Sequence, residues 1–299
     1  MDLTLGPIQF YWDAARIRDF YARIADETPV ARVVLGELVC SKRLPFWQHE
    51  IPLAVERLRA AGKEVILTSL ALITLKRERQ MTDELAEAGA MVEIADLTAL
   101  AHLPPGTPFS VSPLINVYNE GTLGWLASRG AKRVCLPPEL QPEAVARLAA
   151  EGARLGVSVE VWGFGRLPLA ISGRCYHARL HDRAKDSCQF VCNVDLDGRR
   201  VDTMDGQQFL AVNGVQTLSA ATAFAGQDDI ARLAGAGITA LRLSPQTGDM
   251  VALTRAFADA LQGNGDPAVL EAAARAAAPD GQLANGYLRG QAGANWVAA

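Results

Sequence analysis

The stretch PLAVERLRAAGKEVILT, residues 52–68, contains one complete repeat of the pattern on which the fold prediction rests. Residues 52–61 are amphipathic, as in a surface helix, and Gly62 follows at the position where a helix commonly ends in a left-handed residue. Residues 64–68 form a short apolar run that is typical of a parallel strand buried on both faces. The stretch therefore predicts a helix, a glycine and a strand, in that order.

The same order recurs along the chain at intervals of roughly 25 to 35 residues, which is the spacing of βα units. About eight such units, with no clear boundary between two halves, favour a (β/α)8 barrel of the α/β class over an open sheet. We expect residues 1–299 to form this one barrel domain. The candidate strands are residues 4–10, 31–36, 64–68, 91–95, 109–112, 133–136, 157–162, 209–212, 215–218 and 238–243.

The repeat is interrupted late in the chain. A long polar insertion, residues 163–214, follows the candidate strand at 157–162. Within it, residues 189–195 and 200–203 are expected to form a hairpin turned by Asp197-Gly198. Further on, residues 267–277 have the pattern of a helix, and the tail, residues 279–299, is expected to be irregular.

Composition gives no support to several classes of protein. The chain of 299 residues is 49% hydrophobic and carries a net charge of −4, so it has ample material for a core and no basic patch that would indicate nucleic-acid binding. Its longest apolar run, residues 65–75, is about half the length that a membrane span requires. The N-terminus has no pattern of a signal peptide, so we expect a cytoplasmic protein without structural disulfides.

Common catalytic motifs are absent from the sequence. There is no G-x-S-x-G elbow, H-E-x-x-H helix or Walker loop. Residues 235–240 match G-x-G-x-x-A, but they follow a helix and precede a strand. This is the reverse of the dinucleotide-binding order, and it indicates an ordinary turn between a helix and a strand.

Histidines near the cysteines offer two weaker hypotheses. His177 and His181 are four residues apart, as are Asp182 and Asp186, so a metal site is conceivable, but solvated polar side chains are the commoner meaning of such spacing. Cys175 and His177 could form a nucleophilic pair, although proximity in sequence does not establish hydrogen-bond geometry.

The five cysteines are distributed unevenly. Cys175, Cys188 and Cys192 lie in a C-x12-C-x3-C pattern after a candidate strand, and Cys40 follows another. In barrels of this kind, the loops after the strands carry the functional groups and share one face. Cys40 and the three later cysteines are therefore expected to meet there, whereas Cys135 lies within an apolar strand and is expected to be core.

Four thiolates in one place indicate either zinc or an iron–sulfur cluster. Structural zinc sites commonly use paired C-x2-C knuckles, which this chain lacks. The pattern is one isolated cysteine, a long gap and then C-x12-C-x3-C. It better suits a cubane cluster, which is wider than a single ion and can be held between separate loops. The spacing therefore favours a cluster over zinc without excluding zinc.

The segment from Ser172-Gly-Arg-Cys175 through Cys188 and Cys192 to NVDLDGRR resembles the signature of the collagenase-like peptidase family of barrel proteins. LGPIQFYW, ELVCSKR and NGYLRGQAG, at residues 5–12, 37–43 and 285–293, make the chain most similar to the ubiquinone-biosynthesis branch of that family. The resemblance covers essentially the whole chain.

The resemblance implies a 4Fe–4S cluster held by Cys40, Cys175, Cys188 and Cys192. It also implies a role as the iron–sulfur subunit of an O2-independent hydroxylation in ubiquinone biosynthesis, in a heterodimer with a UbiU-like protein, with a ubiquinone precursor as a further possible partner. The chain departs from the peptidase members because it has no recognisable protease constellation. A zinc-stabilised scaffold, a peptidase and an RNA-modifying relative are the alternatives.

Overall fold

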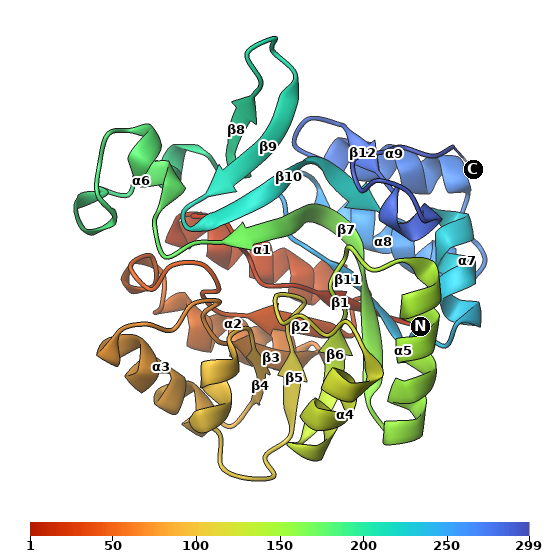
Figure 1. The fold of residues 1–299 in the computed structure, drawn as a ribbon, viewed down its shortest axis with the longest axis horizontal. Coiled ribbons are helices and arrows are strands. Elements are labelled where there is room, and N and C mark those ends of the chain that lie inside the picture. Colours follow the sequence, from red (N-terminus) through yellow and green to blue (C-terminus); the bar gives the residue numbers. More distant parts are fainter. Residues whose placement is uncertain (299) are drawn as a thin grey trace.

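The computed structural model describes residues 1–298 and shows a closed barrel of eight parallel strands (Figure 1). Each strand pairs with the next in sequence from β1 to β7, and β11 closes the ring by pairing in parallel with both β1 and β7. The predicted (β/α)8 class is therefore confirmed. The barrel strands are β1 (Asp2–Leu5), β2 (Arg32–Leu35), β3 (Glu64–Thr68), β4 (Met91–Ile94), β5 (Phe109–Val111), β6 (Ala131–Cys135), β7 (Ser158–Ile171) and β11 (Ala240–Leu243).

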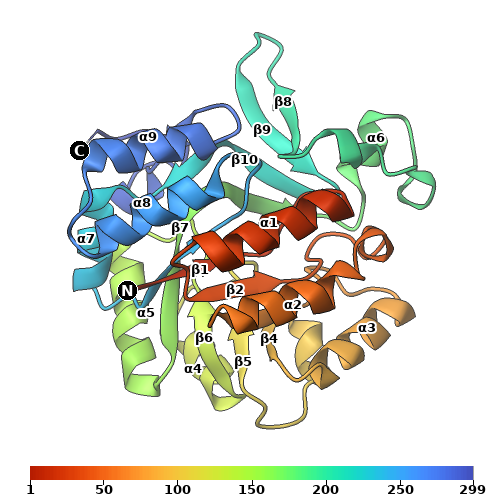
Figure 2. The same cartoon turned by 180° about the vertical axis from the view of Figure 1, so that it is seen from behind.

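Helices cover the outside of the barrel, as the two opposite views show (Figures 1 and 2). Between β4 and β5 the connection holds only the short 3-10 helix η2, and Pro104 and Pro105 follow it closely, which prevents a longer helix. The helices are α1 (Ala14–Glu27), α2 (Glu50–Ala60), α3 (Lys76–Glu87), η2 (Leu97–Ala101), α4 (Glu120–Ser128), α5 (Pro142–Leu155), α7 (Gln227–Gly235), α8 (Met250–Leu261) and α9 (Pro267–Ala277).

Residues 52–68 form the predicted unit. The amphipathic part lies in α2 and buries Leu58 completely, and EVILT is β3 with the predicted bounds. Gly62 has φ +76°, a left-handed conformation that glycine adopts without the penalty of a Cβ. The predicted helix at residues 267–277 is also confirmed as α9.

An ion cluster fills part of the barrel interior. The Arg242 guanidinium, only 1% exposed, donates to the Glu93 carboxylate over 2.8 and 2.6 Å and to the Glu160 carboxylate over 2.9 Å. Thr4 Oγ1 donates to Glu160 over 2.7 Å. Buried charges are stable only when paired and hydrogen-bonded in this way.

Two barrel strands differ most from their predicted bounds. The strand expected at 4–10 is β1 (Asp2–Leu5), because Gly6 and Pro7 follow and proline has no amide hydrogen for the ladder. The strand expected at 157–162 is β7 (Ser158–Ile171), which continues beyond the barrel and there pairs antiparallel with β10 (Gln216–Phe224).

The segment between β7 and β10 projects from one end of the barrel (Figure 1). The hairpin expected between residues 189–195 and 200–203 is wrong. Residues Val191–Val194 form the 3-10 helix η4, and β8 (Arg199–Asp202) pairs antiparallel with β9 (Gln208–Asn213). A second Asp-Gly pair, Asp205-Gly206, lies in the turn of the observed hairpin, and Gly206 has φ +81°.

The same projection contains α6 (Tyr176–Leu180) and η3 (Lys185–Ser187). The C-terminal segment after α9 is largely irregular, with a short strand β12 (Leu283–Ala284) beside β10 and a 3-10 turn η5 (Tyr287–Arg289). Within residues 1–298, none of the helices has the length and apolar character needed to cross a bilayer.

Candidate cysteine site

Cys40 lies just after the carboxyl end of β2, in a turn fixed by a buried carboxylate. Gly36 leaves the strand with φ +135°, a conformation that favours glycine. The Glu37 carboxylate then accepts hydrogen bonds from the amides of Val39 and Cys40, each over 2.9 Å. These contacts hold the backbone of Cys40 in place.

Cys175 lies shortly after the end of β7 and is the N-cap residue of α6. Its Sγ accepts a hydrogen bond from the amide of Ala178 over 3.4 Å. Cys188 and Cys192 follow on either side of a tight turn, in which Gln189 and Phe190 both adopt positive φ, 50° and 54°. Non-glycine residues rarely adopt this conformation, and such strain is commonly found at functional sites.

Charge effects on pKa connect these four thiols with one another. Burial raises the pKa of the Cys175 thiol, and negative charge on Cys40 or on Cys188 would raise it further. Burial likewise raises the pKa of Cys192, as would charge on Cys175 or Cys188. Thiols influence one another in this way only when they are near neighbours, since charge interactions weaken with distance.

Cys135 is placed elsewhere. It lies in β6, is fully buried, and its pKa is raised by burial and influenced by the charges of Arg242, Glu160 and Glu93. The thiol thus faces the ion cluster inside the barrel. It does not join the other four.

Arg43 is a member of the site that the sequence reasoning missed. Its guanidinium is 1% exposed and donates to the carbonyl of Gln9 over 3.0 Å and to Asn213 Oδ1 over 2.9 Å. Its Nε has no hydrogen-bond partner among residues 1–298. The positive charge opposes the effect of burial on the pKa of both Cys40 and Cys192. The only signal in the sequence was its position three residues after Cys40.

Aromatic rings lie beside the thiols and were also missed. Phe46 and Phe190 pack edge to face with centroids 4.7 Å apart, and Tyr11 lies 5.8 and 6.0 Å from them. Burial raises the pKa of Tyr11, and charge on Cys192 would add to the effect. The three rings therefore form a cluster next to Cys192.

His177 has a structural role in this arrangement. It is fully buried, its Nε2 lies 2.8 Å from Asp195 Oδ2, and its Nδ1 accepts a hydrogen bond from the Gly214 amide over 3.1 Å. Both ring nitrogens are thus occupied, so His177 does not form a nucleophilic pair with Cys175. His181 is exposed and is not part of this network.

The donor chemistry of the site fits an iron–sulfur cluster. Four thiols come from separate segments, two of them on the structured turn after α6, and the unpartnered Nε of Arg43 is available to donate to sulfur. Such hydrogen bonds tune the potential of a cluster. In the part of the chain that the structure describes, no three His, Cys, Asp or Glu side chains are gathered closely enough to hold a single metal ion.

The fold and the site together define a (β/α)8 barrel protein with a thiol-bearing projection at the carboxyl ends of its strands. The model of peptidase family U32 matches residues 12–298, and the chain belongs to that family. This confirms the resemblance to the collagenase-like peptidases at the level of the family.

Solved structures similar to the chain share little sequence with it. One is an enolase, a putative galactarate dehydratase from Agrobacterium radiobacter, with 16% identity over 54% of this chain and 44% of that one and a TM-score of 0.36. Another is an uncharacterized B. cereus protein, with 13% identity over 81% of this chain and 61% of that one and a TM-score of 0.40. The chain thus spans less than two thirds of either protein. At these values neither likeness bears on what the chain does.

Proposed function

We propose that the chain is a UbiV-like protein, the iron–sulfur subunit of an O2-independent hydroxylation in ubiquinone biosynthesis that acts with a UbiU-like partner. The observation that supports this most is that thiols from separate segments influence one another's pKa and that buried Arg43 influences them too. The resemblance of residues 5–12, 37–43 and 285–293 to the ubiquinone-biosynthesis branch supplies the rest.

In this proposal Cys40, Cys175, Cys188 and Cys192 hold a 4Fe–4S cluster. The cluster would supply single-electron transfer when bound. Arg43 would donate a hydrogen bond from Nε to sulfur and offset part of the negative charge of the thiolates. The Phe46 and Phe190 rings would limit the access of water, and burial of this kind influences the potential of a cluster.

Analysis of iron and acid-labile sulfide after purification without oxygen tests the cluster. We expect a brown protein with about four irons per chain. Cys40→Ala, Cys175→Ala, Cys188→Ala and Cys192→Ala should each deplete iron, whereas Cys135→Ala, a matched control, should retain it. A colourless protein with one zinc per chain would contradict the cluster and indicate a zinc-stabilised scaffold instead. Dependence of the iron on Cys135 rather than Cys40 would contradict the assignment of ligands.

Quinone analysis tests the pathway separately. Deleting the gene should abolish ubiquinone made during anaerobic growth and leave aerobic ubiquinone unchanged. Unchanged anaerobic ubiquinone with altered RNA modification would instead favour an RNA-modifying member of the family. Recovery of a UbiU-like protein with the tagged chain, at equal stoichiometry, tests the heterodimer.

A further inference from the structure

An open hollow of about 510 Å³ lies on the projection, beside the candidate cysteine site. It is lined by residues 173–175, 179 and 182–185, which belong to α6 and to the turns on either side of it. In the ribbon, α6 lies at the outer end of the projection, away from the barrel (Figure 1). Cys175 is partly exposed and lines the hollow, so a molecule bound there would lie next to one of the four candidate ligands.

The charged side chains around the hollow are mostly positive. Four basic residues and one acidic residue, Asp182, line it, and the basic ones are Arg174, Arg179, Arg183 and Lys185. Four positive charges and one negative charge give the hollow a net charge of +3, on a chain whose net charge is −4. Within residues 1–298 none of the four basic side chains makes an ion pair, so their charge is available to a partner.

Another acidic residue near the hollow is already paired. Asp186 Oδ1 lies 3.0 Å from Lys42 Nζ, and the same Nζ donates to the carbonyl of Lys185 over 2.8 Å. Asp186 therefore does not balance the basic residues of the hollow. The two contacts of Lys42 also fix this wall of the hollow to the turn that contains Cys40.

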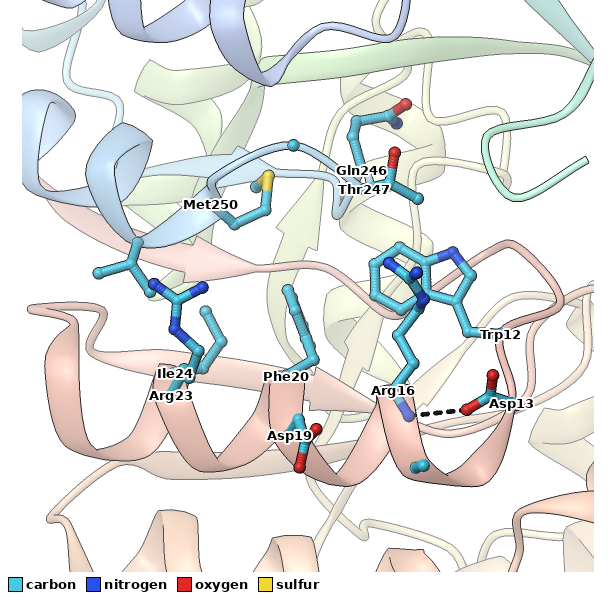
Figure 3. A pocket seen from close by; sticks show the side chains of 13 residues that line it. Trp12, Asp13, Arg16, Asp19, Phe20, Arg23, Ile24, Gln246, Thr247 and Met250 are labelled. Atoms are coloured by element: carbon cyan, nitrogen blue, oxygen red, sulfur yellow. Dashed lines mark hydrogen bonds between the residues drawn. The ribbon is translucent and has the colours of Figure 1, made fainter.

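The groove between α1 and the loop that joins β11 to α8 has no such excess of charge (Figure 3). Its lining includes Arg16 and Arg23 but also Asp13 and Asp19, so the positive and negative charges are equal in number. The positive hollow is thus a local feature next to Cys175.

The charge of the hollow selects an acidic partner. Opposite charges accelerate the encounter of two proteins and orient them. Proteins that exchange single electrons commonly form small, weak complexes, and a patch of only four basic side chains suits such a complex. Nucleic acid would require a wider and more strongly positive surface.

We propose that the hollow is the docking surface for a small acidic protein that carries single electrons. The carboxylates of the reduced carrier pair with Arg174, Arg179 and Lys185. One electron then leaves the carrier, which is oxidised, and reduces the cluster held by the four cysteines, with no atom transferred. The inference rests on the proposed function, to which it adds the source of the electrons.

Isothermal titration of the full chain, purified without oxygen, with an oxidised plant-type 2Fe–2S ferredoxin tests the surface. This ferredoxin is an acidic one-electron carrier. We expect a Kd below about 100 μM in about 20 mM NaCl, and binding at least roughly ten-fold weaker in about 300 mM NaCl, because salt screens the charges. No binding up to about 1 mM, or an affinity that does not depend on salt, would overturn the proposal.

Two smaller or longer anions test whether the partner is a protein. Inorganic phosphate and a single-stranded RNA of about 12 nucleotides are titrated at the same ionic strength. We expect both to bind more weakly than ferredoxin. Saturable binding of phosphate without binding of ferredoxin would overturn the proposal and indicate a site for a small anion. Tighter binding of the RNA than of ferredoxin would overturn it in favour of nucleic acid.

Variants locate the interaction. Arg179→Gln combined with Lys185→Gln should weaken ferredoxin at least roughly ten-fold in about 20 mM NaCl. The matched control is Arg59→Gln combined with Lys132→Gln, which removes the same two charges near the amino ends of barrel strands, at the other end of the barrel. Within residues 1–298 neither of these makes an ion pair, and the control should change the affinity less than roughly two-fold. Equal losses in the two pairs of substitutions would refute the assignment of this surface.

Iron analysis of the same samples separates this inference from the proposed function. About four irons per chain in the variant that loses ferredoxin affinity would support the docking surface, since the cluster is then intact. Iron in the native chain without binding of ferredoxin would overturn the docking surface and leave the proposed function intact. A native chain that binds ferredoxin through these residues but holds no iron would support the surface and contradict the proposed function.

Discussion

Replacing Arg242 with methionine should destabilise the barrel strongly. The change keeps much of the side-chain volume but removes the charge that neutralises fully buried Glu93. Within residues 1–298 the Glu93 carboxylate otherwise has only Ser110 Oγ, at 3.5 Å. Glu160 is less affected because Arg32 and Arg133 remain 3.5 and 3.8 Å away. Since an isolated buried charge is the source of the cost, we expect a loss of about 3–5 kcal/mol in the free energy of unfolding.

Equilibrium unfolding in urea at pH 7, followed by circular dichroism, measures this loss. Adding Glu93→Gln to Arg242→Met should recover part of it, because the buried negative charge is removed, and the double-mutant cycle should show about 1–3 kcal/mol of coupling. Arg154→Met, which breaks an exposed pair with Glu151, serves as the control and should change stability by no more than about 0.5 kcal/mol. A cost below about 1 kcal/mol for Arg242→Met, or strictly additive effects, would refute the reasoning.

Two further predictions concern the frame of the site. Burial tends to raise the pKa of Glu78, but hydrogen bonds from Ser41 and from the amides of Leu75 and Thr74 outweigh it and leave the pKa below 4.5. The carboxylate therefore contributes stability above pH 4.5 that is lost as the pH falls through its lowered pKa. In urea titrations from pH 6 to about pH 3, the free energy of unfolding should decline less for Glu78→Gln than for the native chain. Gly36→Ala should lower the free energy of unfolding by about 1–3 kcal/mol, because φ is +135° and a Cβ would lie 3.1 Å from the carbonyl oxygen of Thr68. Gly62→Ala, with φ +76° and no atom within 4 Å of the added Cβ, should cost less, and an equal effect on Tm would contradict this account.

The barrel could be predicted because its elements are determined locally. Apolar runs, amphipathic helices and glycines at helix ends follow one another regularly, and β3 and α9 have the bounds expected from sequence. The hairpin could not be predicted in the same way. Residues 197–198 and 205–206 are both Asp-Gly pairs, so local turn chemistry is equal for the two, and the choice depends on pairing of β9 with β10.

The sequence was sufficient to select the cysteines of the candidate site, but not the residues that surround them. Cys40 could be grouped with Cys175 because both follow barrel strands, whose carboxyl ends share one face. Arg43 could not be recognised from sequence, and neither could the structural role of His177. Their burial results from contacts with Gln9, Asn213 and Gly214, which are distant in the chain and come together only in the fold.

The length of β7 has a mechanical consequence for the sulfur region. Residues of β7 pair with β11 inside the barrel, and the same strand continues without a break to pair with β10 from Phe164 to Ile171. A swinging motion of the projection would therefore have to break this pairing, which has two register shifts but still costs several backbone hydrogen bonds to rupture. Cys175 follows the end of β7 and is therefore held by the same barrel as Cys40. A group bound by both thiols would keep nearly constant geometry whatever its charge.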